Sequence, residues 1–113
     1  MSSVFLYSSL FALVGILFVG LSIPLIQQRV APNRYYGFRT PRTLSNPEIW
    51  YKVNHISGVD LFVAGALIAI SSLMMLVFAQ AWTPQHVAIT LLLVMVFSLT
   101  GVAWHGFRVL SRM

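Results

Sequence analysis

Three long stretches of uncharged, mostly apolar residues run through this chain, and polar positions gather between them. The first stretch covers residues 4–26, and the other two share residues 61–107, where no Lys, Arg, Asp or Glu occurs. An α-helix rises about 1.5 Å per residue, so about 20 apolar residues cross a hydrocarbon core of about 30 Å. The pattern therefore predicts an all-α integral membrane protein with three transmembrane helices.

The division between the second and third stretches falls at Trp82-Thr83-Pro84. Thr is favoured as an N-cap and Pro in the first helical turn, so Thr83 and Pro84 are expected to begin a helix. We place the spans at about 4–26, 60–80 and 84–107 of a single membrane domain, 1–113. A connection this short makes the last two helices antiparallel neighbours. A cleaved signal peptide fits the first stretch less well, because it needs a basic start and a shorter apolar core.

The basic residues indicate how the chain is oriented. They fall between the first two spans and in the C-terminal tail: Arg29, Arg34, Arg39, Arg42, Lys52, Arg108 and Arg112. The N-terminus and the turn between the last two spans carry no Lys or Arg. Under the positive-inside rule the basic side is cytoplasmic. The sequence thus predicts a multi-pass protein with its N-terminus outside and its C-terminus in the cytoplasm.

Composition narrows the classes of function. Charged residues make up 8% of the chain, against about 25% in soluble domains. The net charge of +5 lies at the predicted membrane edges, so topology explains it better than nucleic-acid binding. The chain has no cysteine, and it lacks an H-E-x-x-H pair, a Gly-rich phosphate loop and a G-x-S-x-G turn. We therefore expect no metal, no cofactor and no enzymatic activity.

Residues 27–44 show neither helical nor strand periodicity, and a connection of this length is usually functional or disordered. Its aromatic residues favour an ordered loop. Gly37 permits a positive φ or a close backbone approach, and Thr40-Pro41 imposes an extended step before the next helix. The Arg39 guanidinium can serve in two ways, and the sequence leaves both open. In the first it holds the loop against helix ends or Glu48. In the second it contacts a ligand or a lipid phosphate.

A short amphipathic helix is predicted to follow. Ser45-Asn46-Pro47-Glu48 resembles a capping box in which the Ser45 side chain accepts from the Glu48 amide. Ile49, Val53 and Ile56 then recur at helical spacing, which suits a helix on the membrane surface. A bend at 57–58 and continuity with the second span are both compatible with the sequence.

The centre of the chain carries the pattern N-x-x-x-G-x-R-T-P-x-T-L-x-x-x-x-x-W, followed by an N-H pair and a glycine. Its residues include Asn33, Gly37, Arg39, Thr40, Pro41, Thr43, Leu44, Trp50, Asn54 and Gly58. At these positions the chain resembles the SdpI family of bacterial membrane proteins. The chain departs from the family at Pro32, which directly precedes Asn33 instead of standing one residue away.

The resemblance implies a bacterial inner-membrane protein that confers immunity to, or senses, a membrane-active antimicrobial peptide by binding. Its implied partners are membrane lipids, a peptide toxin and a cytoplasmic repressor held at the membrane. The best-known member is longer, with additional membrane segments. We expect ligand-binding residues among the matched positions and beside them, at Glu48, His55, Asp60 and His105.

Asp60 and His105 form a second candidate group. A carboxylate at the edge of the hydrocarbon is costly and normally partnered. In antiparallel helices Asp60 and His105 fall at the same depth in the membrane. One prediction is that Asp60 pairs with His105, Arg108 or Arg39, and the other is that Asp60 is unpaired and reaches water.

Small residues on two stripes of the second span predict that this span lies between the other two helices. A small transporter or channel component that uses Asp60 and His105 is the alternative function, and the oligomeric state, homo-oligomers included, stays open.

Overall fold

The computed structural model describes residues 3–78 and 81–113, and this part of the chain is all-α. Its helices are α1 (Ser3–Ile26), α2 (Pro41–Ser45), α3 (Pro47–Phe78) and α4 (Pro84–Ser111). Three of them, α1, α3 and α4, are long and apolar enough to cross a membrane. The three-span prediction is therefore confirmed, although residues 79–80 of the predicted second span lie outside the described residues.

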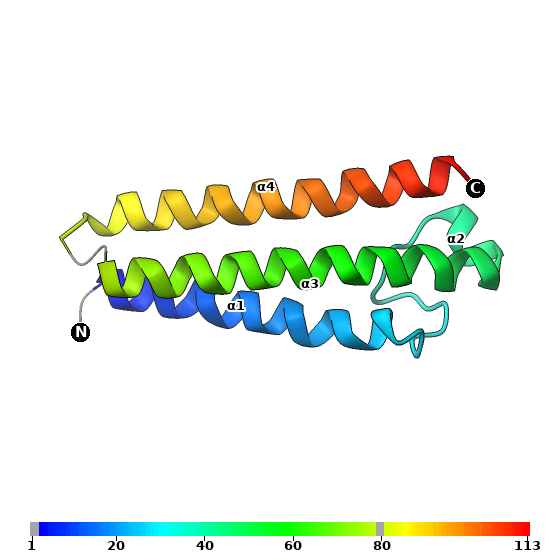
Figure 1. The fold of residues 1–113 in the computed structure, drawn as a ribbon, viewed down its shortest axis with the longest axis horizontal. Helices are drawn as coiled ribbons and strands as arrows, with labels where there is room; N and C mark the ends of the chain where they lie inside the picture. Colours follow the sequence, from blue (N-terminus) through cyan, green and yellow to red (C-terminus); the bar gives the residue numbers. More distant parts are fainter. Residues whose placement is uncertain (1–2, 79–80) are drawn as a thin grey trace.

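The long helices lie side by side, with α3 between α1 and α4 (Figure 1). The molecule measures 51 × 23 × 19 Å, so its long axis exceeds a hydrocarbon core of about 30 Å. The start of α1 and residues 81–83 before α4 lie at one end, and the loop 27–40, α2 and the C-terminus lie at the other (Figure 1). All the basic residues thus belong to segments at the second end, as the charge pattern predicts.

Glycines bring α1 and α3 into backbone contact. A Cβ atom added to Gly15 of α1 would lie 2.6 Å from the Ala69 nitrogen and 2.7 Å from the Gly65 oxygen of α3. A Cβ on Gly58 would meet Leu25 and Ile26 at 3.0 Å. Small residues allow such approach in lipid, where dispersion contacts rather than water drive helix association. One predicted small-residue stripe of the second span therefore packs on α1.

The helix α4 begins with a side-chain cap. Thr83 is its N-cap and accepts from the His86 amide at 3.3 Å, with Pro84 in the first turn, which confirms the predicted start. At this end Val4, Val87 and Leu91 form a buried apolar cluster. The helix continues to Ser111, beyond the predicted residue 107.

Two local predictions are wrong. The segment expected to be loop up to Leu44 contains α2, capped by Thr40 in a capping box with Thr43. The predicted Ser45 cap is also incorrect, because the Ser45 hydroxyl donates to the Arg42 carbonyl at 3.0 Å within α2. Asn46 takes its place, and its Oδ1 accepts from the Glu48 amide at 3.0 Å.

Residues 47–58, predicted as a short amphipathic helix, form the first turns of α3. The helix passes through Ser57 and Gly58 without interruption, since Gly58 packs against the end of α1 and needs no bend to do so. Val53 is fully buried in the protein rather than presented to lipid. The 32 residues of α3 rise about 48 Å, so its first turns extend beyond the hydrocarbon core at the basic end.

Candidate functional site

The loop after α1 is ordered by its own side chains. The Asn33 Oδ1 accepts from the amides of Tyr35 and Tyr36 at 2.8 and 2.9 Å, and its Nδ2 donates to the Ala31 carbonyl at 2.8 Å. The Arg39 Nε donates to the Asn33 carbonyl at 2.9 Å. Of the two interpretations of Arg39, the structure supports pinning, and the acceptor is the loop itself rather than Glu48.

Side chains from the first turns of α3 hold this loop by hydrogen bonds to its backbone. The indole of Trp50, which is completely buried, donates to the Val30 carbonyl at 2.7 Å. One turn later the Asn54 Oδ1 accepts from the Phe38 amide at 2.6 Å, while its Nδ2 donates to the Trp50 carbonyl at 2.9 Å. Two motif residues on one helix face therefore fix both the start and the middle of the loop.

Gly37 lies where these anchors meet. Its φ is +117°, a conformation that L side chains rarely adopt. A Cβ there would lie 2.9 Å from the Asn54 Oδ1 and from the Trp50 ring. The sequence predicted a positive φ or a close approach at this glycine, and the structure shows both.

Thr43 also holds the loop, next to the contacts that Asn54 makes with Phe38. Its side chain is fully buried, donates to the Phe38 carbonyl at 3.0 Å and accepts from the Thr40 amide at 2.8 Å. Pro41 fits the first turn of α2 because its missing N–H is not needed there. The matched motif residues therefore build the loop's conformation, and most of their polar atoms are already used inside the protein.

The end of α1 is held by the same region. Its last turn closes with Gln28 at a φ of +58°, and the His55 Nδ1 donates to the Ile26 carbonyl at 2.6 Å. Tyr36 donates its hydroxyl to the Leu21 carbonyl at 2.9 Å, and burial raises the pKa of this phenol. Glu48 stands in the first turn of α3, where a carboxylate interacts favourably with the helix dipole.

Two residues that sequence reasoning did not select join the loop to α4. The Arg42 Nη1 donates to the Leu110 carbonyl at 2.8 Å, near the end of α4, where a cation also complements the helix dipole. The Phe38 ring meets Phe107 edge to face, with centroids 5.0 Å apart, and covers Gly106. No local sequence signal indicates these contacts, because they join residues far apart in the chain.

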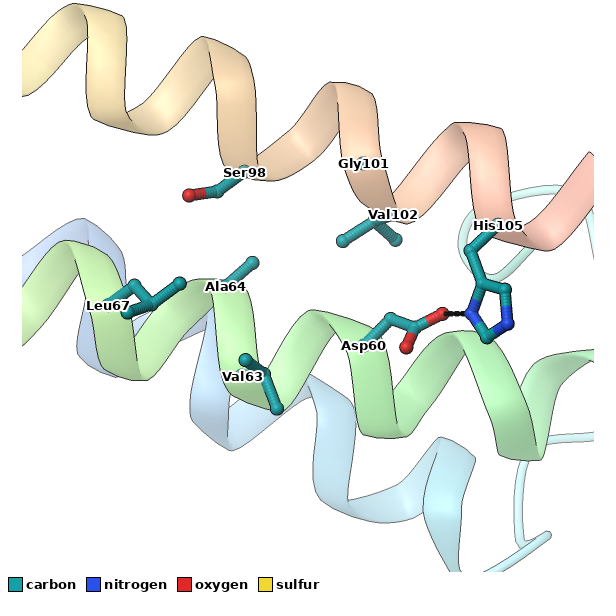
Figure 2. A pocket seen from close by; sticks show the side chains of 8 residues that line it. All are labelled: Asp60, Val63, Ala64, Leu67, Ser98, Gly101, Val102 and His105. Carbon is teal, nitrogen blue, oxygen red and sulfur yellow. Dashed lines mark hydrogen bonds and ion pairs between the residues drawn. The ribbon is translucent and has the colours of Figure 1, made fainter.

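A groove of about 290 Å³ separates α3 from α4 farther into the membrane-spanning region. Its walls are Asp60, Val63, Ala64, Leu67, Ser98, Gly101, Val102 and His105. Figure 2 shows Asp60 and His105 at one end of it, with the His105 Nδ1 hydrogen bonded to the Asp60 Oδ2. The predicted pairing of Asp60 with His105 is confirmed. The second small-residue stripe of α3, with Ala64, faces this groove.

Most of the candidate residues thus form two neighbouring groups, while Glu48 stands in the first turn of α3. The loop group holds Asn33, Gly37, Arg39, Thr40, Pro41, Thr43, Trp50, Asn54 and, at the end of α1, His55. The groove group holds Asp60 and His105. Across residues 3–78 and 81–113 no three His, Cys, Asp or Glu side chains gather as a metal would require.

Comparison with known proteins decides the family. The model of the SdpI/YfhL protein family matches residues 29–101, which is more than half of the chain. This protein belongs to the SdpI family. The match covers the loop, α2, α3 and most of α4. It therefore includes the α3 wall of the groove of this SdpI-family protein and half of the α4 wall, since Val102 and His105 lie beyond residue 101. No curated protein and no solved structure matches the chain.

Proposed function

We propose that this SdpI-family protein confers immunity to a membrane-active antimicrobial peptide by binding it within the bilayer. Membership of the family carries the proposal, because the resemblance implies peptide immunity. The groove between α3 and α4 supports a binding role. It lies between two helices that are long and apolar enough to span the membrane, where a membrane-embedded peptide could reach it.

Expression in a peptide-sensitive bacterium tests this function. Cells that carry the protein should survive a membrane-active peptide that kills cells with an empty vector, and should gain no new ion conductance. The Asn54→Ala protein, compared at equal membrane abundance, leaves the Phe38 amide without its acceptor and should protect less. Equal killing of protected and unprotected cells across a panel of such peptides would refute immunity.

The proposed orientation places the N-terminus outside and the loop group and C-terminus in the cytoplasm of a bacterial inner-membrane protein. It follows from the distribution of Lys and Arg and puts the loop where a cytoplasmic repressor could meet it. The native chain has no cysteine, so single-cysteine variants report cleanly. A membrane-impermeant maleimide should label position 2 or 85 in intact cells and should not label position 42 or 111. The reverse labelling would invert the topology.

One observation favours a second candidate function, a small transporter or channel component. Asp60 and His105 form a proton-binding pair beside a groove, as proton-coupled carriers require. Flux of an ion or solute in proteoliposomes that is lost in Asp60→Asn would support transport. Survival of the peptide without any flux would support immunity.

A further inference from the structure

The polar end of the groove offers hydrogen-bond acceptors. An ionised carboxylate only accepts, so the bond between the Asp60 Oδ2 and the His105 Nδ1 places the imidazole proton on Nδ1. In neutral His105 the other ring nitrogen, Nε2, is then an acceptor, as is the Asp60 Oδ1. Both side chains are partly accessible, at 24% for Asp60 and 49% for His105. A ligand that reaches this end must supply donors.

The charge at this end is negative when His105 is neutral. The chain has two acidic residues, and Asp60 is the one that lines the groove, since Glu48 lies three turns earlier on α3. The nearest basic residue along α4 is Arg108, which is exposed and is not part of the groove walls. The side chain of Arg42, which lies on the loop side, is bonded to the Leu110 carbonyl. A cation in the groove would therefore face an anion.

Apart from Ser98, the remaining walls are apolar, and they leave space in the middle. Val63, Ala64 and Leu67 line one side, and Val102 lines the other beside Gly101. A Cβ added to Gly101 would meet no atom within 4 Å, so the groove has room at this point for another group (Figure 2). A short aliphatic chain that ends in a donor cation matches the shape and the polar groups of this groove.

We propose that this groove binds a lysine side chain of the membrane-embedded peptide, with its methylenes along Gly101 and its ammonium at Asp60. The assignment rests on the proposed immunity function, and it names the class of residue that the protein recognises. A lysine combines an apolar stem with a donor-only cationic head, which matches the two parts of the groove. The carboxylate offsets the cost of holding that cation at the edge of the hydrocarbon.

Dodecylammonium is a suitable probe, because it joins an alkyl chain to a primary ammonium. The labelled protein is placed in phosphatidylcholine nanodiscs, and the amide resonance of Val102 is followed during titration. Dodecanol and dodecanoate, with the same chain and other head groups, serve as matched ligands. We expect saturable binding of dodecylammonium at least tenfold tighter than that of either matched ligand.

Three variants sharpen the test. Gly101→Leu should fill the groove and weaken dodecylammonium binding at least tenfold, whereas Gly20→Leu, also with open space around it, should change it less than twofold. Asp60→Asn keeps the side-chain shape, removes the negative charge and should also weaken binding at least tenfold. The buried Trp50 indole resonance verifies that each variant is folded.

Two outcomes would overturn the assignment. One is equal binding of the three head groups, which indicates partitioning into lipid only, and the other is unchanged binding by folded Gly101→Leu. These results are independent of the survival assay. Probe binding without protection refutes immunity and leaves the cation site standing, while protection without probe binding refutes the lysine assignment alone.

Discussion

Replacing Trp50 with alanine is expected to lower the free energy of unfolding by about 3–5 kcal/mol, the range for truncating a buried large aromatic side chain. Trp50 is 0% exposed, and its indole holds the Val30 carbonyl. Its loss opens a cavity under the loop and removes the contact that Gly37 packs against. Reversible unfolding in mixed micelles, with increasing dodecyl sulfate, measures the change.

Trp104→Ala is the matched control. This tryptophan is 70% exposed on α4, so truncating it should cost less than about 1 kcal/mol in the same micelles. The loop should also lose order in Trp50→Ala but not in Trp104→Ala, seen as faster amide exchange at Tyr36 and Phe38. Equal destabilisation by the two substitutions would contradict the anchoring role assigned to Trp50.

Gly15→Ala is expected to destabilise the protein by about 1–3 kcal/mol, although alanine is the better helix former. The new Cβ would lie 2.6 Å from the Ala69 nitrogen and 2.7 Å from the Gly65 oxygen. Both are backbone atoms, so no rotamer change relieves the overlap and α1 must move away from α3. The same micelle unfolding assay measures the loss.

Gly20→Ala provides the comparison on the same helix. Nothing lies within 4 Å of a Cβ at Gly20, so helix propensity alone acts, and we expect a stability change between zero and a gain of about 1 kcal/mol. The two glycine substitutions should therefore differ in sign. A stabilised Gly15→Ala protein would show that α1 and α3 are farther apart than the structure has them.

The long uncharged runs were sufficient to predict the three spans, because lipid requires uninterrupted helices and the start signals at Thr83 and Pro84 are local. The depth argument for Asp60 and His105 also succeeded, since two antiparallel helices leave few alternatives. Asp60 and His105 are 45 positions apart, but their common depth follows from the length of two helices joined by a short turn.

The loop was harder to predict for a physical reason. Thr40, Ser45 and Asn46 are all competent N-caps, and only the packing of Thr43 and Trp50 selects Thr40 for α2 and Asn46 for α3. The contact of Arg42 with Leu110 spans 68 positions in the chain, so no local pattern signals it. The resemblance identified the motif residues, whereas their hydrogen bonds became known only from the structure.

If the protein confers immunity by holding a peptide in the α3–α4 groove, a side chain that fills this groove should abolish protection. The decisive measurement is the survival of peptide-challenged cells carrying Gly101→Leu, compared with cells carrying Gly20→Leu at equal membrane abundance. Both substitutions add the same side chain at a glycine with open space, and of the two only Gly101 lines the groove. We expect Gly101→Leu cells to lose protection and Gly20→Leu cells to keep it. Equal survival of the two strains would refute peptide binding in the groove.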